Sequence, residues 1–206
     1  SMDGVDESKR ATLKRFGAIG AVSPFARFAG DNDDDGQERS DRREAIVGYL
    51  ATTPGAHFSK LRDDLKLGTG EAQHHLRRLE SDGRVESEKD GDYRRYFPSG
   101  RFSAFEKRAL GYLRRDTARK LVLALLANPD ATGGDLAAEL GVSRPTVSRY
   151  VGELESAGLL SREDGYALVA PERLLVLVVR YADSFGPETV AFAADASDLL
   201  SYDPTS

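Results

Sequence analysis

The sequence has no cysteine and no tryptophan, and it has only one methionine and three histidines. The lack of cysteine excludes a disulfide framework, a cysteine-ligated zinc site and a thiol nucleophile. No apolar run approaches the ~20 residues that a membrane-spanning helix needs. No phosphate-binding loop, glycine-rich dinucleotide fingerprint or supported Ser/His/Asp set is present. The sequence therefore predicts no catalysis and no bound cofactor.

The histidines His57, His74 and His75 have no carboxylate cluster beside them at metal-ligand spacing. Because a protein metal site needs several such ligands together, we predict no metal site. No small-molecule ligand is predicted either. His57 is expected to be structural.

The 206 residues include 29 lysines and arginines against 34 aspartates and glutamates, a net charge of −5. This length, with 40% hydrophobic residues, favours two small domains that each bury a core. Arginine outnumbers lysine 22 to 7, and aspartate outnumbers glutamate 20 to 14. Such usage is typical of halophilic archaea, although a GC-rich genome explains it without any adaptation to salt.

An acidic total argues against nucleic-acid binding, since such domains usually carry a basic surplus. The charge is unevenly placed, however. Residues 101–120 carry seven cations and two carboxylates, whereas 121–170 and 171–206 each sum to −4. The total therefore does not exclude DNA binding. It predicts weak non-specific binding, with the electrostatic footprint in the first domain and in 101–120.

The chain contains an internal repeat with a period of 75 residues. Residues 46–85 align with 121–160 without a gap, and ten aligned pairs are identical. These pairs are Val47/Val122, Leu50/Leu125, Pro54/Pro129, Ala56/Ala131, Leu61/Leu136, Leu65/Leu140, Leu79/Leu154, Glu80/Glu155, Ser81/Ser156 and Gly83/Gly158. A period this long is typical of a small domain and not of a solenoid repeat, so one domain is present twice.

The first copy predicts the order helix, short strand, helix, turn, helix and β-hairpin. Asp41 and Glu44 form a cap-like pair before its first helix, and Ser59 is expected to cap the second. Two extended runs within 84–97 are joined by Asp90-Gly91-Asp92, a strong hairpin signal.

The second copy repeats this order. Thr132 is expected to cap its second helix, Gly141 to end that helix and Ser143 to cap the third. A hairpin follows within 159–169, with its turn at 163–165.

Both third helices resemble those of a known family. The run Ser143-Arg144-Pro145-Thr146-Val147-Ser148-Arg149-Tyr150, followed by Leu154-Glu155-Ser156-Ala157-Gly158-Leu159-Leu160, resembles the recognition helix and following strand of winged helix-turn-helix transcription regulators. The stretch Ala72-Gln73-His74-His75-Leu76-Arg77-Arg78-Leu79-Glu80 with Asp82-Gly83 is similar to the same element of ArsR-like and MarR-like regulators.

The resemblance implies a mainly α fold with small β-hairpins (α+β), with two tandem winged helix-turn-helix domains and C-terminal helices. The expected segments are a tail and acidic linker (1–40), domain 1 (41–100), a basic connector helix (101–115), domain 2 (116–170) and a helical dimerisation segment (171–206).

In such a fold the third helix of each copy enters the major groove of DNA. Arginine suits guanine edges and phosphate, and glutamine can pair with adenine. The residues expected to face outward are Thr69, Glu71, Gln73, His74, Arg77 and Arg78 in the first copy, and Ser143, Arg144, Thr146, Ser148 and Arg149 in the second. The alternative is a solvated helix face with incidental charges.

The first hairpin carries Lys89, Arg94 and Arg95, and we expect these cations to contact phosphate. The second hairpin has only Arg162, beside Glu163 and Asp164, so we expect it to be the poorer phosphate contact.

The connector has a capping box at Ser103 and Glu106, and its helix is amphipathic. Its cations could neutralise several phosphates, which would make affinity steeply salt-dependent. A solvated face is an equally good explanation.

The two ends of the chain differ in character. Pro171 fits the start of a helix whose middle, Leu174 to Val179, is apolar all round, as in helices buried on both sides. We expect a second subunit to cover it, giving a homodimer through 171–200; packing between the two domains of one chain is the alternative. Residues 9–29 run from basic to apolar with Pro24 inside, which favours a docking tail over a membrane-interface helix.

The sequence therefore predicts a cytoplasmic, sequence-specific regulator of transcription that binds double-stranded DNA. One alternative is a tandem winged-helix protein-protein interaction module, similar to those of chromosome-segregation complexes. Another is a membrane-associated regulator, although membrane association is not expected. Arg77, Arg78, Arg144 and Arg149 on the outward faces favour DNA.

Overall fold

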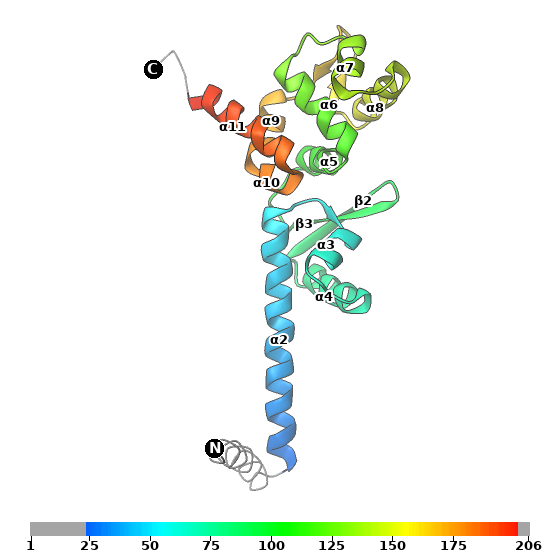
Figure 1. Ribbon diagram of the computed structural model, residues 1–206. Helices are drawn as coiled ribbons and strands as arrows, with labels where there is room; N and C mark the ends of the chain where they lie inside the picture. Colours follow the sequence, from blue (N-terminus) through cyan, green and yellow to red (C-terminus); the bar gives the residue numbers. More distant parts are fainter. Residues whose placement is uncertain (1–23, 202–206) are drawn as a thin grey trace, which may run out of the picture. The chain divides into compact units, whose positions relative to one another are not determined.

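The computed structural model describes the backbone of residues 24–201 and the side chains of 34–196. The basic part of the predicted docking tail lies outside the described residues. The chain divides into two units, Ser1–Glu44 and Ala45–Ser206, and both repeat copies, 46–85 and 121–160, lie within the second. Figure 1 shows the order of the elements.

Helix α2 (Pro24–Thr52) begins before the first repeat copy and ends inside it. Asp41 lies within α2, where its Oδ1 accepts a hydrogen bond from Gln37 Nε2 at 3.0 Å. The prediction that Asp41 caps this helix is wrong, because good helix formers such as Gln37 and Glu38 extend the helix towards the N-terminus. Residues 31–40, predicted as an acidic linker, are helical too.

The first copy has the predicted order of elements. They are the end of α2, β1 (Ala56–His57), α3 (Phe58–Asp64), α4 (Thr69–Ser81), β2 (Val85–Asp90) and β3 (Tyr93–Pro98). The strands form an antiparallel sheet in the order β1-β3-β2. The helices bury Ile46, Leu50, Leu61, Leu76 and Leu79 against the sheet as one core.

Ser59 does not cap α3. The N-cap is His57, in extended conformation, so Ser59 lies in the first turn. The chain passes directly from β1 into α3, and the strand pairing of His57 with Arg95 therefore decides where the helix begins.

The connector and the second copy follow the predicted caps. The elements are α5 (Ala104–Leu113), α6 (Asp116–Ala127), α7 (Gly133–Leu140), α8 (Arg144–Ser156), β4 (Leu160–Ser161) and β5 (Ala167–Leu168). Ser103, Thr132 and Ser143 each accept a hydrogen bond from a backbone N–H three residues on. Gly141 ends α7 with φ of 67°, a left-handed conformation that favours glycine.

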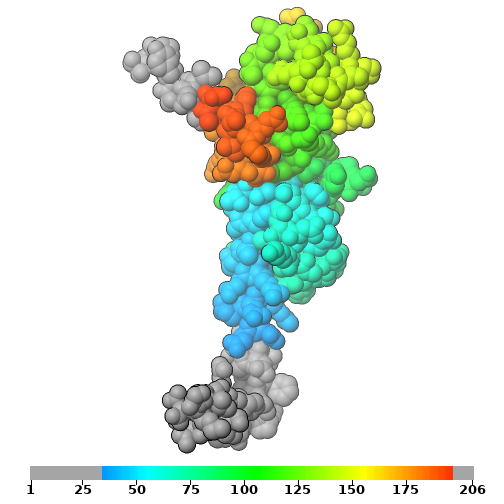
Figure 2. All heavy atoms as spheres, viewed as in Figure 1, coloured from blue at the N-terminus to red at the C-terminus, as the bar shows by residue number. Residues whose placement is uncertain are grey.

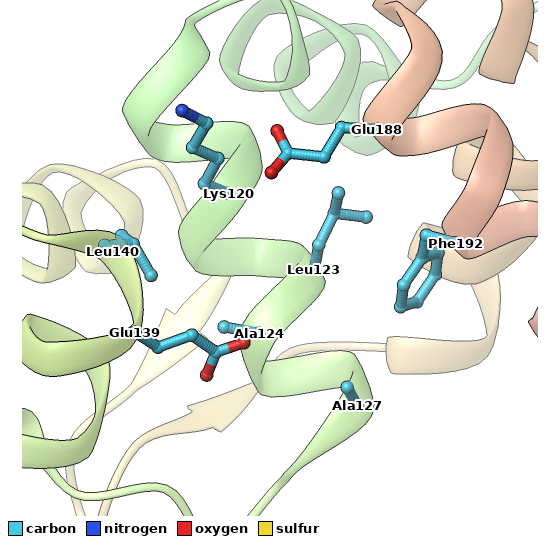
Figure 3. A pocket seen from close by; sticks show the side chains of 8 residues that line it. All are labelled: Lys120, Leu123, Ala124, Ala127, Glu139, Leu140, Glu188 and Phe192. Carbon is cyan, nitrogen blue, oxygen red and sulfur yellow. The ribbon is translucent and has the colours of Figure 1, made fainter.

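The C-terminal helices are α9 (Pro171–Arg180), α10 (Ala182–Phe185) and α11 (Pro187–Ser201). They share one core with the connector and the second copy, to which Leu110, Leu121, Val151 and Val178 contribute. Figure 2 shows them lying directly against the connector and second copy. Between α6, α7 and α11 a hollow of about 240 Å³ remains, with Leu123 and Phe192 among its apolar walls and Glu139 and Glu188 pointing into it (Figure 3).

Helix α9 buries only one of its sides in the chain. Leu174, Leu177 and Val178 are buried, whereas Val176 is 57% exposed. The buried side packs on α5 and α11. Between residues 24 and 201, none of the helices combines the length and apolar character that crossing a bilayer requires.

Candidate nucleic-acid interface

Helix α4 presents a polar face to solvent. Gln73, His74, Arg77 and Arg78 are exposed. The opposite face packs into the core, as the 3.6-residue period of a helix requires. Arg77 Nε donates to the carbonyl of Gln73 at 3.3 Å, and Arg78 Nε donates to Asp82 at 3.2 Å. Four of the six residues predicted on this helix therefore share one exposed face.

The other two predicted residues serve the start of α4. The backbone N–H of Gly68 donates to Glu71 Oε2 at 3.5 Å, and Glu71 Oε1 lies 3.8 Å from Nε2 of the buried His75. Thr69 Oγ1 accepts a hydrogen bond from Arg62 at 3.2 Å. Glu71 is thus turned towards its own helix and not outward as predicted.

A hollow of about 360 Å³ separates α4 from the first hairpin. Arg77 and Gln73 line it from the helix, and Arg94 lines it from β3. Lys89 stands directly opposite Arg94 in the strand register. Glu80 is the one carboxylate among the residues that line this hollow. Cations from a helix and a strand therefore lie on both sides of one groove.

Arg95 has a structural role, and its predicted contact with phosphate is wrong. Its side chain is 3% exposed. Its Nε donates to Asp90 at 2.5 Å, and its Nη1 donates to the carbonyl of Gly55 at 3.0 Å. Because successive side chains of a strand point to opposite faces, Arg94 and Arg95 cannot both face the groove.

The connector cations also bind the protein itself. Lys107 lies 2.7 Å from Glu88, and Arg115 donates to Asp90 at 2.9 Å. Arg108 donates to the carbonyl of Ala157 at 2.9 Å. Arg119 and Lys120 pair with Asp116. Several connector cations therefore pair with carboxylates or donate to backbone carbonyls within the chain, whereas Arg101 and Arg108 stay exposed, and the electrostatic footprint on the connector remains a prediction.

Arg114 is a partly buried connector cation with several partners. Its guanidinium donates to the carbonyl of Pro54 at 2.9 and 3.1 Å, and to the carbonyl and hydroxyl of Ser184 at 3.0 and 2.9 Å. It also stacks 4.3 Å from the ring centre of Phe185. Burial lowers the pKa of Arg114. It joins the end of α2 to α10.

The residues predicted on α8 fall into two groups, as on α4: some lie on the exposed face of the helix and others at its N-terminus. Arg144, Ser148 and Arg149 are exposed. The hydroxyls of Ser143 and Thr146 lie 2.9 Å apart at the helix N-terminus, where Ser143 is the N-cap. Arg144 and Arg149 therefore remain the cations on the exposed face of α8.

The second hairpin has only two residues in each strand. Its cation Arg162 turns back onto α8, where Nη2 donates to the carbonyl of Ser148 at 3.1 Å and Nε lies 3.8 Å from Glu155. Glu163 and Asp164 stay exposed at the turn. Arg162 thus has partners within the chain, and the poorer phosphate contact of this hairpin stays a prediction.

His57 is half-buried and its ring centre lies 4.8 Å from that of Tyr93. Burial, with Arg95 and Lys60 nearby, lowers the pKa of His57. Among the described residues, no group of three or more His, Asp or Glu side chains is placed to hold a metal ion.

Each copy thus pairs an exposed third helix with a hairpin, and comparison with known families identifies both. A family of N-terminal HTH domains matches residues 40–110, and a family described as winged helix-turn-helix DNA-binding matches residues 114–161. The chain carries two helix-turn-helix domains in tandem. In these HTH domains α4 and α8 occupy the position of the second helix of the motif.

The HTH domains also appear in a relative. The chain is 29% identical over 131 residues to an uncharacterized HTH-type transcriptional regulator of Methanocaldococcus jannaschii, in a match that covers 63% of this chain and 33% of that protein. The chain therefore spans about a third of the length of this relative. Human N-acetylserotonin methyltransferase in complex with SAM matches with a TM-score of 0.27 and 13% identity, over 89% of this chain and 50% of that one. So weak a likeness says nothing about function.

Sequence reasoning missed the residues that join the first HTH domain to the connector. Asp90 was expected only to form a turn, yet it binds both Arg95 and Arg115. One signal was available: three carboxylates at alternate positions of one strand, Glu86, Glu88 and Asp90, share a face and need cations opposite them.

Proposed function

We propose that the chain is a sequence-specific regulator of transcription that binds double-stranded DNA through α4 and α8. Both helices are the second helix of an HTH domain, the element that enters the major groove in this motif. The similarity to an HTH-type transcriptional regulator supports the regulatory role. The candidate contacts that are exposed are Thr69, Gln73, His74, Arg77, Arg78, Lys89, Arg94, Ser143, Arg144, Ser148 and Arg149.

The groove between α4 and the first hairpin carries this proposal. Arg77 and Arg94 face it from opposite sides, and Gln73 lines it from the helix. A phosphate in the groove accepts charge-assisted hydrogen bonds from both guanidinium groups. Gln73, four residues before Arg77, then lies towards the base edges, where an amide can pair with adenine. Phosphate contacts of this kind fix position, and base contacts select sequence.

The proposal includes a homodimer that forms through 171–200. Val176 on α9 and Val190 on α11 are 57% and 40% exposed. A second copy of the chain would bury them, and a two-fold axis would place two pairs of HTH domains on a symmetric site.

Selection from a pool of random double-stranded DNA, with the full chain as bait, tests the function. We expect a discrete motif to be enriched. Gln73→Ala and Arg144→Ala should each relax one position of that motif, at a cost of about 1–3 kcal/mol per lost base contact. Arg101→Ala, an exposed arginine outside both helices and hairpins, is the control and should leave the motif unchanged. If no motif is enriched, the chain is better described as an interaction module.

A further inference from the structure

The tip of the first hairpin is held by an ion-pair cluster. Asp90 Oδ2 accepts a hydrogen bond from Arg95 Nε at 2.5 Å, and its Oδ1 accepts one from Arg115 Nη2 at 2.9 Å. Arg95 belongs to the hairpin, whereas Arg115 lies between α5 and α6. One carboxylate therefore joins the first HTH domain to the connector.

The hairpin and α5 approach each other closely at this point. A Cβ atom added to Gly111 of α5 would lie 2.9 Å from Asp90 Oδ2 and 3.3 Å from Arg95 Cδ. These distances are shorter than ordinary van der Waals contact, so a side chain at position 111 would displace the paired side chains of Asp90 and Arg95. The glycine makes room for the cluster.

A second pair of carboxylates strengthens the same contact. Lys107 Nζ of α5 lies 3.4 Å from Glu86 and 2.7 Å from Glu88. With Asp90, these residues occupy alternate positions of β2 and so share one face of the hairpin. Arg94 lies on the other face and lines the groove, and Lys89 stands opposite it in the strand register. The hairpin thus has a connector face and a groove face.

Helix α5 also reaches the second HTH domain. Arg108 Nε donates to the carbonyl of Ala157, the C-cap of α8, at 2.9 Å. A cleft of about 210 Å³ is lined by hairpin residues, by α5 and by Ala157. Helix α5 therefore contacts both the first hairpin and the end of the second recognition helix.

The second hairpin has no equivalent of this cluster. In the 75-residue register, Glu86, Glu88 and Asp90 correspond to Ser161, Glu163 and Gly165. The carboxylate row is thus not a requirement for building a hairpin of this domain. Its presence in one copy indicates a role in the contact between domains.

We propose that Asp90 and Arg115 form a latch that fixes the first HTH domain on the connector and so sets the separation of α4 and α8. Resting on the proposed function, the latch makes the protein selective for the spacing between two DNA half-sites. Asp90 and Arg115 are positioning residues, since neither lies in the groove that holds the candidate DNA contacts. Opening the latch leaves each recognition helix intact and loosens only their separation.

A distance measurement between the two recognition helices tests the latch without DNA. The chain has no cysteine, so Ser81→Cys and Ser156→Cys place two spin labels selectively. Both serines are exposed, end α4 and α8 respectively, and are equivalent in the repeat. Pulsed electron–electron double resonance then gives the distribution of distances between the two spin labels.

Arg115→Met removes the connector's arm of the latch, and Asp90→Asn keeps the shape of the side chain while removing its charge. We expect both to broaden the distance distribution and shift its mean. Asp92→Asn is the control, because Asp92 is exposed in the same turn and has no ion pair within the described residues. A distribution in both latch variants equal to that of the parent overturns the proposal.

A second readout uses DNA carrying two half-sites of the selected motif. Arg115→Met should lose about tenfold in affinity at the preferred spacing, which is part of the gain that linking two binding modules provides. Affinity for a single half-site should not change. A broadened distance distribution without any DNA binding would keep the latch and reject the proposed function. Selective DNA binding with an unchanged distance distribution in the latch variants would keep the proposed function and reject the latch.

Discussion

Arg94 and Arg95 are neighbours in β3, yet their side chains lie on opposite faces of the first hairpin. Arg94 is exposed, lines the groove beside α4 and donates to Ser87 Oγ at 2.9 Å. Arg95 is buried and donates to Asp90 and to the carbonyl of Gly55. Arg94 is thus a candidate DNA contact, whereas Arg95 stabilises the fold. Substitution of Arg94 should change DNA affinity, and substitution of Arg95 should change stability.

Arg94→Ala should weaken binding to all DNA sequences alike, because a phosphate contact carries no sequence information. The slope of log affinity against log salt concentration should become shallower by about 1. Titrations of labelled DNA at several salt concentrations measure both effects. A loss confined to one base pair of the motif would argue against a phosphate role for Arg94.

Arg95→Ala should lower the free energy of unfolding by about 3 kcal/mol, because it breaks a buried ion pair and leaves Asp90 with one partner fewer. Urea unfolding followed by circular dichroism measures the change. Arg94→Ala is the matched control, and its unfolding midpoint should stay close to that of the parent. Equal midpoints for the two variants would contradict the structural role of Arg95.

The Asp90 cluster should make stability depend on pH in the acid range. Burial raises the pKa of Asp90, but hydrogen bonds from Arg115 and Arg95 outweigh burial and hold it below the ordinary value of 3.8. A carboxyl group whose pKa is lower in the folded state than in the unfolded state stabilises the folded protein fully at pH values above its unfolded-state pKa. This contribution to stability is lost as the pH falls through the folded-state pKa. The urea midpoint of the parent should therefore fall more steeply than that of Asp90→Asn below about pH 4. If the urea midpoints of the parent and of Asp90→Asn change in parallel with pH, the ion pairs of Asp90 do not contribute to stability.

Gly111→Ala and Gly48→Ala should change stability in opposite directions. Both glycines are helical, but a Cβ at Gly111 meets Asp90 Oδ2 at 2.9 Å, whereas nothing lies within 4 Å of one at Gly48. Alanine at position 48 should stabilise the protein by about 0.5–1 kcal/mol, the difference in helix propensity. Alanine at position 111 should destabilise it, because the ion-paired side chains of Asp90 and Arg95 must move. Thermal melting of the two variants decides, and a gain in stability at position 111 would refute the close contact.

Val176→Asp should shift the protein from dimer to monomer, because it places a charge where the second subunit would bury an apolar side chain. Light scattering coupled to size-exclusion chromatography measures the mass directly. Val169→Asp, which alters another exposed valine outside α9, is the control. A parent that runs as a monomer across the concentration range would reject the dimer.

Local signals predicted much of the fold. The caps at Ser103, Thr132 and Ser143 are correct because each depends on a side chain and a backbone group only three residues apart. The two extended runs and the turn residues between them likewise predicted the first hairpin. Ser59 and Asp41 failed as caps because strand pairing and helix propagation outside the local window decided where those helices begin.

The candidate site was harder to predict, because exposure of a cation depends on what the rest of the chain places against it. The surplus of arginine and lysine in the connector suggested a surface for phosphate. Instead Lys107, Arg108 and Arg115 meet groups that lie 19 to 49 residues away in sequence. Only strand alternation, which allows just one of Arg94 and Arg95 to face out, was readable without the fold.

The carboxylate row on β2 means that the two copies of the repeat are not interchangeable as building blocks. The second copy has serine and glycine at two of the three corresponding positions. A chain rebuilt with two second copies would still contain two HTH domains. Lys107 and Arg115 would, however, lack some of the carboxylates with which they form ion pairs in this chain. The order of the copies along the chain is therefore part of the architecture.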